Sequence, residues 1–202
     1  MNTPPKTAPN RPIDAVVIGA SAGGVNALLG MLSGLPASFC LPVVIVLHLP
    51  EGRQSRLPEI FRHRTAMAVR EAADKETIAP ATLYFAPPGY HLSLEADHTF
   101  SLSCEPPVNF SRPSIDLLMA SAADAYGARL AGIVLTGANA DGAVGLAKIG
   151  AQGGLTVVQD PAEAEIPTMP EAAIRLARPD LILDLKGIRS LLLEMEQLHA
   201  ER

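Results

Sequence analysis

The chain has 202 residues, the size of one ordinary domain, and 48% of them are hydrophobic, enough for a single core. Its 16 Lys and Arg against 21 Asp and Glu give a net charge of −5, which argues against a nucleic-acid module, normally basic. Its apolar runs are far shorter than the ~20 residues that cross a bilayer. Residues 1–12 lack the apolar stretch of a signal peptide, so we expect a disordered tail or linker remnant there, one domain over 13–202 and a cytoplasmic location.

Short apolar runs alternate with stretches of helical spacing along the chain. Runs rich in β-branched residues predict buried strands, and the spacing of apolar residues between them predicts helices. In chain order we expect a strand at 15–18, a helix at 21–34, a strand at 43–47, a helix at 55–64, strands at 82–86, 91–94 and 99–102, a helix at 115–122, a strand at 131–135, a helix at 142–149, a strand at 155–158, a helix at 171–176, a strand at 181–183 and a helix at 188–199.

The order of these elements predicts the fold class. Strands that alternate with helices form right-handed crossovers, which build a parallel sheet covered on both faces. The runs at 91–94 and 99–102 alternate apolar and polar residues around a turn, which is typical of an antiparallel hairpin. We therefore predict an α/β fold with a doubly wound, mostly parallel sheet, helices on both faces and a hairpin near the rim, the edge formed by the strands' carboxyl ends, where ligands bind.

Three of the predicted strands end in chemically reactive side chains. Ser21 follows the first strand, His48 the second, and Asp141 lies just beyond the strand at 131–135. Because parallel strands bring their carboxyl ends to one rim, these residues can form a Ser-His-Asp triad: a nucleophile, its base, and a carboxylate that fixes the histidine tautomer. The G-x-S-x-G pattern around Ser21 resembles a nucleophile elbow, and the helix that follows offers free N–H groups to an oxyanion.

Each of these residues also has a plainer interpretation. Gly19, Ser21 and Gly24 fall at the spacing of a dinucleotide-binding G-x-G-x-x-G, but the middle position is not glycine and the second strand ends in His48 instead of an acidic residue. Taken singly, His48 could be a loop histidine and Asp141 a cap for the helix after it. Their joint occurrence at three strand ends favours the triad.

The remaining histidines and cysteines give no sign of a metal or a disulfide. No paired-cysteine or HExxH spacing is present, so we expect neither a metal site nor a cofactor. Cys40 and Cys104 stand far apart and are interpreted as two small buried hydrophobic residues.

At these residues the sequence resembles the catalytic domain of the CheB-type chemotaxis protein-glutamate methylesterases. The resemblance runs in the family's order over nearly the whole chain from residue 13. Its motifs are VIGASAGG at 17–24, HLP at 48–50, YFAP at 84–87, RPSID at 112–116, LTG at 135–137 with DG at 141–142, and the stretch 153–160. The resemblance implies that Ser21, His48 and Asp141 are the catalytic triad and that no cofactor is needed.

The resemblance also implies a reaction and a partner. The reaction is hydrolysis of glutamate γ-methyl esters, with deamidation of glutamines, in the cytoplasmic helical domain of methyl-accepting chemoreceptors. Two other functions stay open: a different small-ester serine hydrolase, and a catalytically idle receptor-binding module. Arg112 is expected either to contact acidic receptor residues or to form a surface salt bridge.

The sequence departs from the family pattern at three places near the predicted site and in one missing domain. The residue after the nucleophile, often Thr, is Ala22; the usual Gln before the histidine is Leu47; and the Met-Gly after Thr-Gly is Ala138-Asn139. We expect these changes to alter the pocket lining, the substrate range and the rate more than the type of reaction. The family's N-terminal receiver domain is missing from this sequence, so control would come from a separate regulatory protein or from a longer parent chain.

Overall fold

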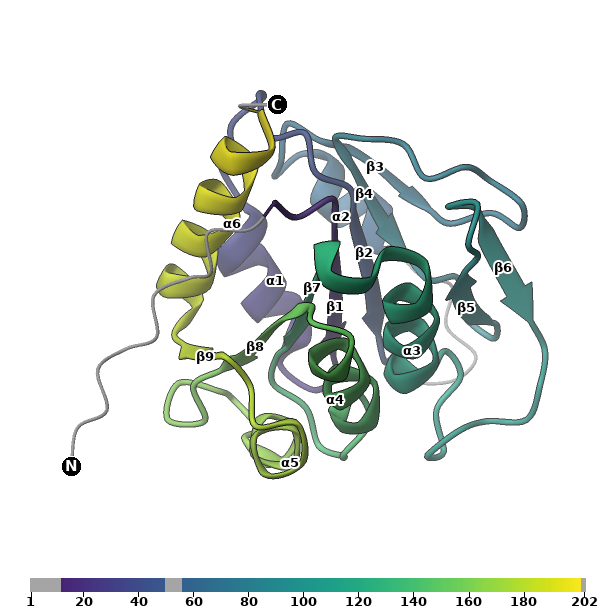
Figure 1. Cartoon of the computed structure of the whole chain (residues 1–202), viewed down its shortest axis with the longest axis vertical. Helices are drawn as coiled ribbons and strands as arrows, with labels where there is room; N and C mark the ends of the chain where they lie inside the picture. The colour runs from purple at the N-terminus through teal and green to yellow at the C-terminus, as the bar shows by residue number, and fades with distance from the viewer. Residues whose placement is uncertain (1–11, 50–55, 201–202) are drawn as a thin grey trace.

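The computed structural model describes residues 12–49 and 56–200, and a seven-stranded sheet forms its centre (Figure 1). Its strands are β1 (Ala15–Ala20), β2 (Val43–Leu47), β3 (Ala68–Glu71), β4 (Thr82–Phe85), β7 (Leu130–Val134), β8 (Leu155–Gln159) and β9 (Leu181–Leu183). They stand in the order β3-β4-β2-β1-β7-β8-β9, and every neighbouring pair is parallel. All six residues of β1 are buried, because both faces of a parallel sheet are covered.

Helices cover both faces of this sheet. They are α1 (Gly24–Leu32), α2 (Leu57–Arg62), α3 (Ile115–Tyr126), which continues into a 3₁₀ turn at Gly127–Arg129, α4 (Ala143–Ala151), α5 (Thr168–Ala177) and α6 (Leu185–Ala200). Apolar residues of α1, α2 and α6 share one core with Val16 and Ile18 of β1. Those of α3, α4 and α5 share the other with Val17. Alternate residues of one strand therefore supply both cores.

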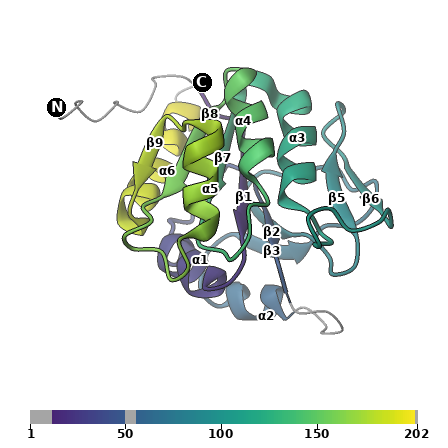
Figure 2. The same cartoon turned by 90° about the horizontal axis from the view of Figure 1, so that it is seen from below.

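The antiparallel hairpin of β5 (His91–Leu94) and β6 (Phe100–Ser103) lies at one side of the molecule, beside α3 (Figures 1 and 2). Its apolar residues join the core that contains α3. The buried ring of His91 accepts a hydrogen bond from the amide of Ser114 at Nδ1 (3.2 Å) and donates one from Nε2 to the carbonyl of Pro106 (3.1 Å). The hairpin thus supports the segment that begins α3.

The predicted doubly wound sheet with its hairpin is confirmed, and one strand was not predicted. β3 pairs at the sheet's edge and buries only Val69 of its four residues, so it lacks the continuous apolar run of a central strand. α5 and α6 begin three residues earlier than predicted, at Thr168 and Leu185. The predicted tail, apart from Pro12, and the first residue of the helix predicted at 55–64 lie outside the described residues.

The strand order reverses at β1, so the carboxyl ends of β1, β2 and β7 meet at the switch point of the sheet. The chain passes from β1 to β2 on one side and later returns to β7 on the other, and ligands bind where a doubly wound sheet reverses in this way. Hydrogen bonds continue past the strand ends. The amide of Ser21 donates to the carbonyl of Thr136 (3.0 Å), and the amide of His48 donates to the carbonyl of Ala20 (3.1 Å). Figure 2 views the molecule from below, toward this rim.

Candidate active site

A buried hydrogen bond joins two of the three predicted site residues. Nε2 of His48, just past β2, lies 2.9 Å from Oδ2 of Asp141, just past β7. The Asp141 side chain is fully buried and that of His48 is 12% exposed, so one edge of the ring reaches the surface. Because a carboxylate can only accept, Nε2 carries the proton and Nδ1 is left as the basic nitrogen.

Asp141 also sits at the amino end of α3. Its carboxylate accepts hydrogen bonds from the amides of Ile115 (2.8 Å) and Asp116 (3.0 Å) and from the hydroxyl of Ser114 (3.0 Å), the N-cap of α3. The alternative that Asp141 caps the helix after it is wrong, because α4 has Gly142 as its N-cap with no side-chain hydrogen bond. Four donors therefore fix the carboxylate that holds His48.

Asp116 caps the opposite helix in return. Its Oδ1 accepts hydrogen bonds from the amides of Gly142 (2.9 Å) and Gly145 (2.8 Å), at the start of α4. Asp116 in the first turn of α3 thus caps α4, and Asp141 just before α4 caps α3, which satisfies free N–H groups at both amino ends. The sequence signal was the pair of short helices with Asp116 in the first turn of one and Asp141 just before the other, but their mutual contact depends on tertiary packing.

The two carboxyl groups have opposite pKa shifts. Burial by itself raises the pKa of Asp141, but hydrogen bonds from His48 and from the amides of Asp116 and Ile115, with attraction to His48, hold that pKa below its ordinary value. Burial raises the pKa of Asp116, and the nearby charge of Asp141 adds to the increase, against the hydrogen bonds from Gly145 and Gly142. Asp141 therefore remains ionised at lower pH than an ordinary aspartate.

These shifts give the two residues opposite effects on stability as the pH changes. Asp141 contributes stability above its unfolded pKa of ~3.9 and loses it as the pH falls through its lower folded value. Asp116 has the reverse shift, so its contribution declines as the pH rises from ~3.9 through its higher folded value. In denaturant titrations, the free energy of unfolding lost in Asp141→Asn should grow with pH, whereas that lost in Asp116→Asn should shrink. The same trend in both variants would contradict this assignment.

Ser21 lies on a sharp turn between β1 and α1, in a pocket that also contains His48. The pocket has a volume of about 200 Å³ and is lined by Ser21, Gly23, Gly24, Val25, Asn26, Leu47, His48, Leu49 and Glu165. The turn depends on Gly23, whose φ of 78° favours glycine. The Ser21 hydroxyl forms no hydrogen bond with another described residue. The same holds for the amide of Ala22, which has the position of the oxyanion donor after the serine of a nucleophile elbow, and for the amide of Gly23 beside it.

A second serine, which is not among the predicted site residues, faces the Nδ1 nitrogen of His48. Oγ of Ser111, in the loop before α3, lies 3.5 Å from Nδ1 of His48 and 3.5 Å from Nδ2 of Asn139. At that length the contact with His48 is weak, so Nδ1 remains able to accept a proton from another group. No pattern around Ser111 indicated this position, because its approach to His48 depends on how the loop folds.

The structure corrects one of the two alternatives for Arg112, the surface salt bridge, and the expectation for the two cysteines. Arg112 donates hydrogen bonds from its guanidinium to the carbonyls of Cys104 and Glu105 (both 3.0 Å), so it stabilises its own loop and forms no ion pair with another described residue. Cys104 is exposed and Cys40 half-buried, so the expectation that both are buried is wrong. Burial, with the charge of Glu196, raises the pKa of the Cys40 thiol.

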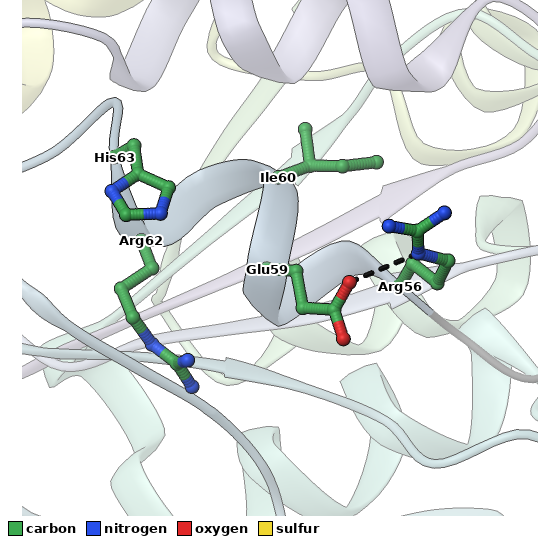
Figure 3. Close-up of a pocket in the computed structure, with 5 residues that line it drawn as sticks. All are labelled: Arg56, Glu59, Ile60, Arg62 and His63. Atoms are coloured by element: carbon green, nitrogen blue, oxygen red, sulfur yellow. Dashed lines mark hydrogen bonds and ion pairs between the residues drawn. The ribbon is translucent and has the colours of Figure 1, made fainter.

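Another pocket, of about 420 Å³, lies over α2 and contains none of the predicted site residues. Arg56, Glu59, Ile60, Arg62 and His63 line it, with an ion pair between Arg56 and Glu59 (Figure 3). Within 12–49 and 56–200, no group of three or more His, Cys, Asp or Glu side chains is arranged to hold a metal ion. No helix in the described part of the chain is long and apolar enough to span a membrane.

Comparisons with known proteins agree with this geometry. The CheB methylesterase family model matches residues 16–192. The catalytic domain of the Thermotoga maritima CheB methylesterase superposes with a TM-score of 0.86 at 31% identity, covering 92% of this chain and 100% of that domain. A Leptospira interrogans protein with the provisional name protein-glutamate methylesterase/protein-glutamine glutaminase is 46% identical over 94% of this chain and 98% of its own length.

Longer relatives match over the same region. The protein-glutamate methylesterase FrzG of Myxococcus xanthus is 34% identical over 95% of this chain, which corresponds to 58% of FrzG. The chain spans about half the length of a Clostridium acetobutylicum relative named protein-glutamate methylesterase/protein-glutamine glutaminase. The family match over most of the chain and the near-complete superposition on a catalytic domain lead to one conclusion: this chain belongs to the CheB methylesterase family.

Proposed function

We propose that the chain is a serine hydrolase that demethylates glutamate γ-methyl esters on the cytoplasmic helical domain of chemoreceptors. Ser21 is the nucleophile, His48 the general base and Asp141 the group that orients it. The observation that carries the proposal is the buried hydrogen bond between His48 and Asp141 beside the pocket of Ser21, in a chain of the CheB methylesterase family. Such a protein would work in the cytoplasm, where that receptor domain lies.

The reaction follows from the protons that each group can hold. Nδ1 of His48 accepts the proton of Ser21 as Oγ adds to the ester carbonyl, while the amides of Ala22 and Gly23 stabilise the oxyanion. The imidazolium then gives its proton to the departing methoxide, which leaves as methanol, and an acyl-enzyme remains. Water gives a proton to His48 and attacks the acyl carbon. The imidazolium then returns that proton to Oγ of Ser21 as the acyl–oxygen bond breaks, which releases glutamate and restores the serine. A glutamine side chain would react in the same way and release ammonia.

Activity should rise with pH in a single acid limb. Only a neutral imidazole can accept the serine proton, so a hydrolase with a histidine base loses activity in acid. Asp141, with its lowered pKa, stays ionised at mildly acidic pH and adds no second limb. The measurement is kcat/KM for ester hydrolysis from mildly acidic to mildly alkaline pH. A flat profile in kcat/KM would argue against a histidine base.

The test of the proposed substrate is methanol release from methylated receptor fragments. Wild-type protein should release methanol, and Ser21→Ala should not. Hydrolysis of small esters without methanol release would indicate a different ester hydrolase. Binding to the receptor with no hydrolysis of either substrate would indicate a receptor-binding module.

A further inference from the structure

The loop between β6 and α3 forms a strained turn at the active site. The amide of Val108 donates to the carbonyl of Ser111 (3.1 Å), and the amide of Ser111 donates to that of Val108 (2.9 Å), which closes a two-residue turn. Its central residues, Asn109 and Phe110, have φ values of 49° and 61°. Asparagine adopts this left-handed conformation readily, but a bulky phenylalanine adopts it at a cost.

Phe110 is also fully exposed. Its relative accessibility is 102%, whereas the other exposed large hydrophobic side chains among the described residues lie between 43% and 61%. The ring therefore gains no packing from the described part of the chain to offset either its strained backbone or its contact with water. Such an outlier at an active site suggests a functional constraint.

Several hydrogen bonds hold this turn against the rim. Nδ2 of Asn109 donates to Oδ2 of Asp116 (3.3 Å), and Ser111 contacts His48. Arg112, the residue after the turn, donates hydrogen bonds to the carbonyls of Cys104 and Glu105. Phe110 is thus a fully exposed residue on an anchored loop, adjacent in sequence to the serine that faces Nδ1 of His48.

We propose that Phe110 is a docking residue for the receptor helix that carries the methyl ester. The inference rests on the proposed function and deepens it. Side chains three or four positions from the modified glutamate lie about 5–6 Å from it on the helix surface. An apolar side chain at such a position can cover the ring and bring the ester to Ser21. Phenylalanine suits this role because it buries a large area and has only two side-chain torsions to order.

The role predicts a split between large and small substrates. Removing the ring should lower kcat/KM for the methylated receptor fragment by about 10- to 100-fold, mainly through KM, because burial of an aromatic ring on binding is lost. Hydrolysis of a small activated ester such as p-nitrophenyl acetate makes no contact beyond the pocket and should not change. The chain should remain folded, since the side chain packs against nothing in the described structure.

The experiment compares four variants on both substrates. Phe110→Ala removes the ring, and Phe110→Asn removes it while supplying a residue that suits the left-handed turn, so a loss in both variants cannot come from turn strain. Phe110→Tyr restores the ring and should restore receptor turnover. Ile182→Ala, on β9 at the far edge of the sheet from β3, removes an exposed apolar side chain elsewhere and should be neutral.

The outcomes separate this inference from the proposed function. Loss on the receptor alone, rescued by Phe110→Tyr, supports docking. Equal loss on both substrates would show that Phe110 acts on His48 through the loop, and no loss on the receptor would show that it does not dock. Either result overturns the inference, while receptor turnover by the wild type still supports the proposed function. If the wild type hydrolyses the small ester but releases no methanol from the receptor, the proposed function fails, and the docking role fails with it.

Discussion

Ser21→Ala should lower the rate of methyl ester hydrolysis by about 10⁶-fold, the scale found when the nucleophile of a serine hydrolase is removed. No other described hydroxyl is on a turn at a helix amino end beside the pocket, where the amides of Ala22 and Gly23 can receive the oxyanion. The Ser21 hydroxyl forms no hydrogen bond with another described residue, so its removal should leave the free energy of unfolding nearly unchanged. The measurement is methanol release per enzyme under saturating receptor, beside a thermal melt.

The pattern of double variants checks that the three residues act together. His48→Gln alone should cost about as much as Ser21→Ala, and the double variant should be little worse than either single one, because a triad works as a unit. Ser111→Ala is the matched control, since it removes the other hydroxyl near His48. Additive losses in Ser21→Ala/His48→Gln, or a loss in Ser111→Ala as large as that in Ser21→Ala, would contradict the assigned roles.

Asp141→Asn should lower the rate by about 10⁴-fold, the effect of the corresponding change in a Ser-His-Asp protease. An asparagine at this position presents either its amide oxygen, a weaker acceptor, or its NH₂ group, a donor, to Nε2 of His48. In the second case Nε2 must accept, so the proton moves to Nδ1, which can then no longer act as the base. The same amide group also faces the amides of Ile115 and Asp116, so one donor meets another, at a cost of about 1–3 kcal/mol of stability.

Asp116→Asn separates the catalytic effect from the structural one. Asp116 is part of the same cross-capped pair of helices, but its side chain has no hydrogen bond with His48. We expect this variant to retain most of its activity when assayed at a temperature where it is fully folded. If Asp116→Asn and Asp141→Asn lost activity equally, the role of Asp141 would be helix capping rather than orientation of His48.

Much of the fold was predictable because its central strands are buried on both faces. The apolar runs at Ala15–Ala20 and Val43–Leu47 have no alternation that could suggest another element, and their carboxyl ends bring Ser21 and His48 to one rim. The edge strand β3 escaped prediction because a strand with one buried residue carries little hydrophobic signal. The position of a residue at the rim was predictable where the residue directly follows a buried strand, as Ser21 and His48 do.

The rest of the site depends on contacts between distant segments. The reciprocal caps of Asp116 and Asp141 require α3 and α4 to meet at their amino ends, and no local pattern encodes that approach. Ser111 reaches His48 on a loop whose turn includes two non-glycine residues with positive φ, a conformation that sequence propensity disfavours for Phe110. The residue that sequence propensity disfavours in this turn, Phe110, is the one that we assign to substrate contact.

The most direct test of the central claim is to identify which serine becomes acylated during turnover. Wild-type protein mixed with methylated receptor fragment is quenched in acid, digested, and mapped by mass spectrometry for a γ-glutamyl ester on serine. We expect the acyl group on Ser21, the serine at the helix amino end, because its pocket contains the base His48 and its turn has the amides of Ala22 and Gly23, which are unpaired among the described residues. An acyl group on Ser111 instead, or methanol release with no acylated serine under conditions where deacylation is slow, would contradict the account.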